Sequence, residues 1–207
     1  MFYNKLLYSP IKAPKVSMED LIRHNVFKSG DLVLFNTQNN YTSHMLFNHI
    51  THVGIVYVKK GEILLFETTH NRHQDFNIST KNTVITTPIY KRLTNYPGFV
   101  YYKKLNKNLT NNMLKKMDDF VNYSLDNKNY DLNFIDYFMN KFILGETFRD
   151  NVNCVEILYE LFDYLDLYDY KDYIKNIGHP LKKIEKLKIL KNGYNYSDII
   201  KIEKEYY

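Results

Sequence analysis

The stretch His52-Val53-Gly54-Ile55-Val56-Tyr57-Val58 decides the fold of this 207-residue chain. β-Branched and aromatic residues dominate it, which is typical of a buried β-strand. A second apolar run follows at 62–68, and Lys60-Gly61, a hairpin-type connection, lies between the two runs. We therefore predict that these two strands pair antiparallel.

Apart from a short N-terminal helix, strand-like runs come first along the chain and helical patterns come later. The predicted strands are 31–35, 52–58, 62–68, 83–87 and 99–105, and the predicted helices are 17–24, capped by Ser17, then 110–125, 132–144 and 153–166. Segment 36–51 is predicted as a loop with one helical turn near 43–48. Because parallel strands need a crossover helix between them, this segregation predicts an α+β domain built on an antiparallel sheet.

The length suits one domain over residues 1–207, with a core at about 29–166 and an extension at each end. A single cysteine excludes an internal disulfide and a cysteine-built zinc site, and it fits a reducing compartment. Residues 1–20 lack the apolar stretch of a signal peptide, and no run of about 18 apolar residues predicts a transmembrane segment. We therefore expect a cytoplasmic protein without a cofactor, and peripheral membrane contact stays open.

The charge balance gives little indication of a nucleic-acid partner. The chain has 28 lysines and arginines against 23 acidic residues, and the basic residues are scattered among the acids. One basic run near the C-terminus is interpreted as a solvated face; it comprises Lys182, Lys183, Lys186, Lys188 and Lys191. Because no basic stripe is interleaved with aromatic residues, there is no strong nucleic-acid signal.

Cys154 is the candidate nucleophile. It begins the predicted helix 153–166 directly after Asn151-Val152-Asn153, where either asparagine can act as N-cap. The free amides and the dipole at a helix N-terminus favour a thiolate over a thiol and can stabilise an oxyanion. A lone cysteine is more often a small core residue, so Cys154 indicates catalysis only together with suitable partners.

A thiol nucleophile needs a base within reach and a third group that orients the base. Among seven histidines, His52 opens an apolar strand, where a polar ring is costly unless it has a partner. Gly54 lies on the same face and leaves space for another element to approach. Glu67 follows the apolar residues 63–66, and antiparallel pairing brings it beside His52. On spacing alone, Glu67 could equally end its strand in solvent.

Five short motifs occur in order along residues 29–164. They are Gly30-Asp31 with the strand after it, His52-Val53-Gly54-Ile55-Val56, Phe66-Glu67, Tyr130-Asp131 and Asn153-Cys154-Val155-Glu156. In this order they resemble the circularly permuted papain-like enzymes of the NlpC/P60 superfamily, which has bacterial YiiX-like and poxvirus-type members. The fold that this resemblance implies is an antiparallel sheet or small barrel packed against helices, with the nucleophile helix after the strands.

The resemblance also implies a role for each matched residue. Cys154 would be the nucleophile, His52 the general base, and Glu67 the group that orients His52. Tyr130 and Asn153 are the candidates for oxyanion or substrate binding. Val155 departs from the small hydroxyl residue that many relatives carry after the cysteine, and this departure bears on the substrate.

The implied activity is that of a thiol protease, amidase or acyltransferase that cleaves a peptide, amide or ester bond through an acyl-enzyme. An alternative is a lipid acyltransferase or phospholipase of the lecithin:retinol acyltransferase type, whose members share the fold and carry a similar Asn-Cys pair. If the protein is viral, the host cytoplasm or the virion is the expected location. A catalytically inactive binding module also stays open. A metal-binding protein also stays open, although the spacing of its candidate ligands matches no established zinc motif. The candidate ligands are His44, His49, His52, His70 and His73.

Overall fold

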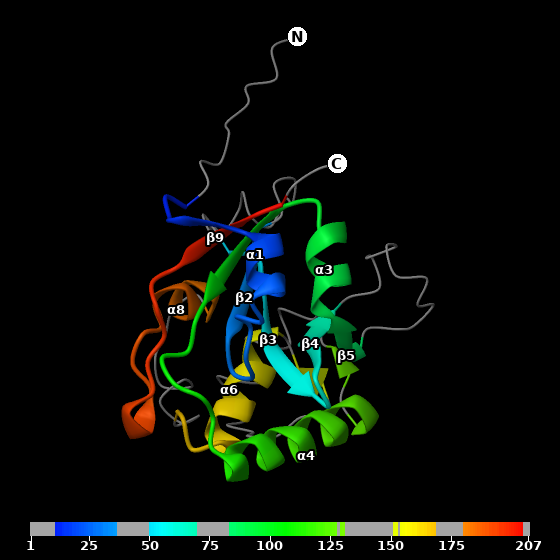
Figure 1. Ribbon diagram of the computed structural model, residues 1–207. Helices are drawn as coiled ribbons and strands as arrows, with labels where there is room; N and C mark the ends of the chain where they lie inside the picture. Colours follow the sequence, from blue (N-terminus) through cyan, green and yellow to red (C-terminus); the bar gives the residue numbers. More distant parts are fainter. Residues whose placement is uncertain are drawn as a thin grey trace.

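Nine strands form one mixed sheet in the part of the chain that the computed structural model describes, residues 11–36, 50–69, 83–127, 129–130, 151–152, 154–168 and 180–204 (Figure 1). The strands are β1 (Lys15–Ser17), β2 (Leu32–Asn36), β3 (His52–Lys59), β4 (Glu62–Thr69), β5 (Thr83–Pro88), β6 (Phe99–Lys103), β7 (Asn129–Tyr130), β8 (Asn151–Val152) and β9 (Ile200–Glu203). They lie in the order β1-β9-β6-β2-β3-β4-β5-β7-β8. The helices of these ranges are α1 (Met18–Arg23), α3 (Ile89–Asn95), α4 (Asn111–Asn127), α6 (Cys154–Tyr164), α8 (Pro180–Lys186) and the 3-10 helix η2 (Lys191–Gly193). The predicted mixture of α and β structure in one chain is confirmed.

The β3–β4 hairpin lies in the middle of the sheet. Tyr57 pairs with Leu64 and Lys59 with Glu62. At the turn, Lys60 and Gly61 have positive φ angles of 51° and 84°. Two successive positive φ angles are what a type I′ hairpin turn requires, and glycine adopts such an angle without strain. The predicted antiparallel pairing of these two strands is confirmed.

The two edges of the sheet depart from the predicted antiparallel pattern. β1 pairs parallel with β9, and β7 pairs parallel with β8. In each pair a long stretch of chain separates the two strands, which gives the room that a parallel crossover needs. The prediction of an antiparallel sheet is right for the central strands and wrong at both edges.

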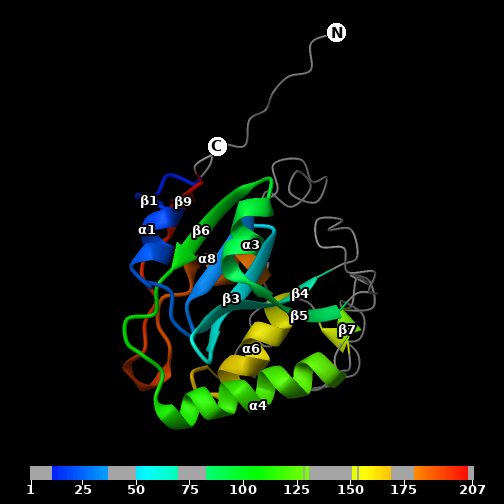
Figure 2. The same ribbon diagram turned by 45° about the vertical axis from the view of Figure 1, so that its right-hand side comes forward.

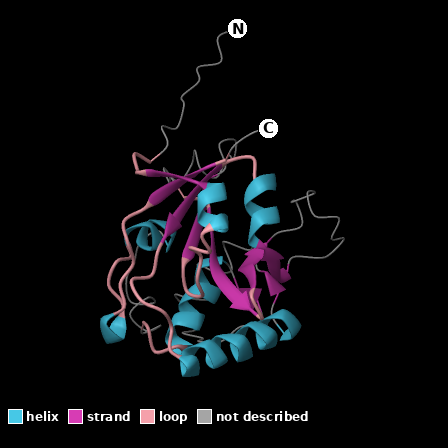
Figure 3. Ribbon diagram, in the orientation of Figure 1, coloured by secondary structure: helices cyan, strands magenta, loops and turns pink. Residues whose placement is uncertain are grey.

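Helices cover both faces of the sheet, as the cyan helices on either side of the magenta strands show (Figure 3). On one face, which we call the α6 face, buried residues of α4, α6 and α8 pack with Ile55 of β3. On the opposite face, the α3 face, residues of α1 and α3 pack with Val56 of the same strand. Successive strand residues point to opposite sides of a sheet, so both sides of β3 are buried.

The helices agree only in part with their predicted ranges. The ranges 110–125 and 153–166 correspond to α4 and α6, and 17–24 corresponds to α1. Ser17 stands at the N-cap position of α1, but its side chain makes no capping hydrogen bond, so the predicted cap is wrong. Ser17 instead pairs with Glu203 in the β1–β9 ladder. The predicted helix 132–144 and the helical turn at 43–48 lie outside the described residues.

The Gly30-Asp31 motif has a structural role. Asp31 is fully buried; its Oδ1 accepts a hydrogen bond from the Leu105 amide at 2.8 Å, and its Oδ2 accepts from the Tyr102 hydroxyl at 2.5 Å and the Lys28 amide at 3.0 Å. Burial raises the pKa of Asp31 to about 6, although these hydrogen bonds oppose the shift. The carboxylate thus joins the start of β2 to Lys28, to Tyr102 in β6 and to Leu105 just after β6.

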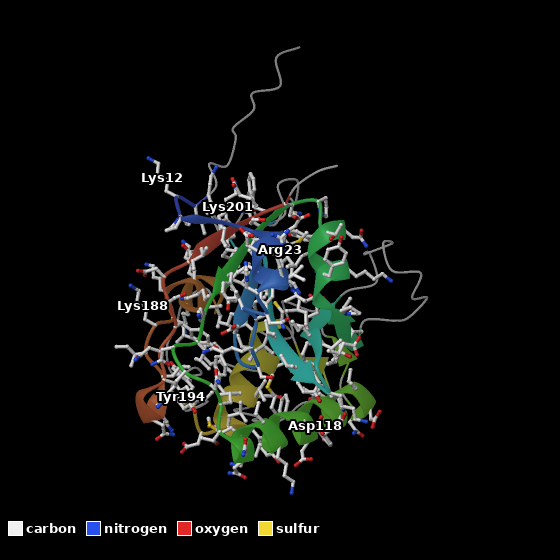
Figure 4. The ribbon with its side chains drawn as sticks, viewed as in Figure 1. Lys12, Arg23, Asp118, Lys188, Tyr194 and Lys201 are labelled. Carbon is white, nitrogen blue, oxygen red and sulfur yellow. The ribbon has the colours of Figure 1, made fainter. Side chains whose placement is uncertain are left out.

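Residues 180–204 complete the sheet beside β6. β9 lies between β6 and β1 (Figure 2), and the Tyr196 hydroxyl donates to the Gly30 carbonyl at 2.7 Å. Lys188 and Lys201 lie on this side of the molecule, whereas Asp118 lies on α4 at the other end, where it accepts from the Tyr57 hydroxyl (Figure 4). None of the helices within the described ranges is long and apolar enough to cross a membrane.

Candidate active site

His52 is the first residue of β3, and its side chain is 18% exposed. The β2–β3 ladder sets it opposite Phe35, whose ring centroid lies 5.5 Å from that of the imidazole with the planes inclined by 34°. The Nε2 atom lies 2.7 Å from Oε2 of Glu67. The rim position therefore has the polar partner that burial of an imidazole requires.

Glu67 reaches His52 from the neighbouring strand. Ile55 pairs with Phe66 across the β3–β4 ladder. Continuing this register by one residue sets Glu67 beside Gly54, on the face of β3 that also carries His52. The Glu67 side chain has no exposed surface, so the alternative that it ends its strand in solvent is wrong.

The space at Gly54 is filled by the adjacent strand. A Cβ atom added to Gly54 would lie 2.8 Å from Cγ of Leu65. Leu65 is itself fully buried on β4. Gly54 therefore accommodates a side chain of β4, so the element that approaches at this glycine is the adjacent strand.

Arg92 of α3 is a member of the site that the sequence analysis missed. Its Nε donates to Oε1 of Glu67 at 2.7 Å, and its Nη2 donates to Oε2 at 3.2 Å. The guanidinium carbon also lies 4.5 Å from the ring centroid of Phe35 and 5.2 Å from that of Tyr96. Arg92 shares the buried face of this short helix with Ile89 and Leu93.

Cys154 is the first residue of α6, and it is 8% exposed. Helix α6 packs against β3 and β4, the two strands that carry His52 and Glu67. The Cys154 side chain lies close enough to the His52 ring to raise its pKa. Because Nε2 is engaged by Glu67, Nδ1 is the ring nitrogen left for the thiol.

The charges of the site support one another. Burial alone would lower the pKa of His52, but the charges and hydrogen bonds of Cys154 and Glu67 raise it to about 9. Burial alone would raise the pKa of Glu67, but the Arg92 cation and the His52 hydrogen bond lower it to about 2. The carboxylate is thus ionised and the imidazole is held as a cation at neutral pH.

The three residues predicted as a triad therefore lie together, while their catalytic roles stay predictions. Tyr130 contributes its backbone to β7, but its side chain lies outside the described residues, as does the whole of Asn153. Of the five histidines considered for a metal, only His52 lies within the described ranges. Those ranges contain no group of three or more histidine, cysteine, aspartate or glutamate residues that could hold a metal ion.

Comparison with protein families and with curated proteins finds no match for this chain. Among solved structures, the chain is similar to the metalloprotein YiiX from Escherichia coli O157:H7, with 14% sequence identity and a TM-score of 0.46. The matched region covers 66% of this chain and 65% of the YiiX chain. The function proposed below rests on the geometry of the site alone.

Proposed function

We propose that this protein is a cysteine hydrolase or acyltransferase that acts on an amide or ester carbonyl, with Cys154 as nucleophile and His52 as general base. The observation that carries this proposal is the buried series of contacts from Glu67 through His52 to Cys154 at the start of α6. A carboxylate, an imidazole and a thiol in this order are the groups that an activated thiol nucleophile needs.

A circularly permuted papain-like fold of the NlpC/P60 type is part of the same proposal. It is supported by the order of the elements, in which a histidine strand and a glutamate strand precede the helix that begins at the cysteine. It is also supported by the packing of α6 on β3 and β4. The mixed sheet with helices on both faces provides the rigid setting for the three side chains.

The first half of the proposed reaction forms an acyl-enzyme. His52 has already taken the Cys154 proton at Nδ1, so the thiolate sulfur attacks the carbonyl carbon; a C–S bond forms and the carbonyl π electrons move to oxygen. The amides of the first turn of α6 face outward at the helix N-terminus and stabilise this oxyanion. His52 then gives the proton to the leaving amine or alcohol as its bond to carbon breaks.

The second half releases the acyl group. His52 takes a proton from water, whose oxygen attacks the thioester carbon, and the collapse of the second tetrahedral intermediate breaks the C–S bond, which releases the carboxylic acid and frees the Cys154 thiolate. An alcohol or amine in place of water gives acyl transfer instead. Hydrolysis and acyl transfer therefore use the same residues and differ only in the acceptor.

A panel of thiol-directed probes carrying peptide amide, simple ester and lipid ester groups tests this proposal. We expect one class to acylate Cys154, as read by mass spectrometry of the intact protein and its peptides, with Cys154→Ser as the control that forms no thioester. Peptide probes would indicate an amidase or protease, and lipid probes an acyltransferase or phospholipase. Reaction with no probe, together with the reactivity of an ordinary thiol at Cys154, would leave the binding module as the better description.

A further inference from the structure

We propose that Arg92 is a positioning residue of this site, which keeps the Glu67 carboxylate ionised and oriented so that His52 presents Nδ1 to Cys154. The proposal rests on the function proposed above for Cys154 and His52. Arg92 is distant in sequence from the motifs of the resemblance, and it reaches the site from α3, on the face of the sheet opposite α6.

The geometry of the Arg92–Glu67 contact fixes the carboxylate in both position and rotation. Two nitrogens of one guanidinium bind two oxygens of one carboxylate, at 2.7 Å and 3.2 Å. A planar fork of this kind restricts rotation of the carboxylate in a way that a single point contact cannot. The lone pair of Oε2 that accepts from His52 is thereby aimed at Nε2, 2.7 Å away.

Because Glu67 is buried, its charge depends on its two partners, and the attraction of the Arg92 cation is the largest single contribution from them. The side chains are 3% and 0% exposed, so water contributes little to either ion. Removing one member of a buried ion pair leaves an uncompensated charge, and a carboxylate in that position gains a proton instead. The surface pair Lys15–Glu203 has side chains 61% and 46% exposed, and its loss would have no such effect.

Protonation of Glu67 would change which ring nitrogen of His52 can accept a proton, in addition to any effect on the fold. A carboxylic acid can donate to Nε2, which then acts as an acceptor and leaves the ring proton on Nδ1. In that tautomer Nδ1 donates toward Cys154 and cannot take its proton. Arg92 therefore acts on the nucleophile through two intermediaries, Glu67 and His52.

A purely structural role is the competing explanation, because the Arg92 guanidinium also lies over the rings of Phe35 and Tyr96. Loss of that packing would lower the melting temperature without changing which ring nitrogen of His52 carries the proton. The tautomer and the pH profile are consequently the measurements that separate the two roles.

The test compares Arg92→Met, which keeps an apolar stem over the two rings, with Arg92→Lys, which keeps the charge but loses the fork. Arg23→Met, at an exposed arginine of α1, is the matched control. We would record ¹⁵N spectra of the His52 ring in a Cys154→Ser background, at a pH where the ring is neutral and only one nitrogen carries a proton. We would also record the pH dependence of iodoacetamide modification in the Cys154 background. The first measurement needs no enzymatic activity, so it tests Arg92 even if the proposed function is wrong.

For Arg92→Met we expect His52 to shift toward the Nδ1–H tautomer and the modification rate at pH 7 to fall by up to about tenfold, the loss expected when the cation beside the sulfur is removed altogether. Arg92→Lys should keep the wild-type tautomer with a several-fold slower reaction. In a Glu67→Gln background, Arg92→Met should cause no further change in the pH profile.

An unchanged tautomer and pH profile in folded Arg92→Met would overturn the positioning role. If Arg92→Met does not fold, Arg92→Lys decides the question, because a wild-type rate in that variant would show that the fork is dispensable. A slow wild-type reaction, equal to that of a free thiol, would instead count against the proposed function while leaving the His52 spectra interpretable.

Discussion

The imidazole of His52 has a different partner at each ring nitrogen, and this determines what it can do. Nε2 faces the Glu67 carboxylate, which favours a proton there in every protonation state of the ring. With its pKa raised to about 9, His52 stays cationic through neutral pH. A cation beside the sulfur favours the thiolate form of Cys154 over the thiol.

The first prediction concerns the reactivity of Cys154. Modification by iodoacetamide at pH 7 should be faster than that of an ordinary cysteine, and His52→Ala should slow it by roughly tenfold because the cation beside the sulfur is lost. The rate would be followed by mass spectrometry across pH. His24→Ala, at the exposed end of α1, is the matched control and should leave the curve unchanged. Equal slow rates in wild type and His52→Ala would mean that the Cys154–His52 pair does not form.

At the residue scale, the sequence predicts three of the four groups that meet at the site. His52 and Glu67 are predictable because each is a polar residue in an otherwise apolar strand, and antiparallel pairing of the two strands brings them together. Cys154 is found because it begins an amphipathic helix. Arg92 is missed because its helix has only seven residues, too short for a periodic pattern to be distinct from a loop between strands.

Among the elements, α8 is held by an unusual buried lysine. Lys103 of β6 is 1% exposed, and its Nζ donates to the carbonyl groups of Ile184, Glu185 and Leu187 at the C-terminal end of α8. Carbonyl groups at the C-terminal end of a helix lack the amide partner of a further turn, and a cation is favoured beside them by the helix dipole. The Ile184 carbonyl also accepts from the Leu187 amide at 3.2 Å. Burial lowers the pKa of Lys103 to about 8, but at neutral pH the ammonium still binds the helix end.

The second prediction is that Lys103→Met destabilises the protein mainly by releasing α8. The methionine keeps most of the buried stem but removes the ammonium from the carbonyl groups of Glu185 and Leu187, which should lower the free energy of unfolding by about 2–3 kcal/mol. Denaturant unfolding measures this loss, and hydrogen exchange should show faster exchange at 181–190. Lys104→Met, one residue on and exposed, should cost little. Unaltered exchange over α8 would show that Lys103 does not hold it.

At the element scale, the strands of the central sheet are predictable because their β-branched runs are long. β9 is harder to predict, since Ile200-Lys201-Ile202-Glu203 alternates correctly for a strand but extends over only four residues. Its parallel partner β1 has three residues. Nothing in the sequence of either strand indicates its partner, which lies almost at the other end of the chain.

Considered as a whole, the described part of the molecule contains several ionisable groups with strongly shifted pKa values, and three of them, Asp31, His52 and Glu67, affect stability with different signs. Asp31 binds its proton more tightly in the folded state, with a pKa of about 6, so it adds stability as the pH falls toward 4. His52, with a pKa raised to about 9, adds stability that is complete below about pH 6.5 and is lost as the pH rises through 9. Glu67, with a pKa lowered to about 2, adds stability above about pH 4.3 that is lost as the pH falls through 2.

The third prediction is therefore a stability maximum on the acid side of neutrality. The free energy of unfolding should be larger at pH 5 than at pH 8, by roughly 1–3 kcal/mol. Asp31→Asn should be less stable at every pH because a hydrogen bond is lost, and its curve should be flatter between pH 6 and 4. Denaturant titrations at constant ionic strength measure both curves, with Asp126→Asn on the exposed end of α4 as the control. A slope in Asp31→Asn as steep as that of wild type would show that Asp31 is not the group responsible.

The position of β9 has a consequence for how this protein is made in the cell. β9 lies inside the sheet between β1 and β6, yet its residues leave the ribosome after those of every other described strand. During translation the nascent chain consequently presents the unpaired edge of β6, and β1 lacks the strand with which it pairs. An open edge of this kind can pair with other chains. Nascent chains that have not yet been extended to residue 200 therefore expose this strand edge, and they are the species that would gain most from binding a chaperone.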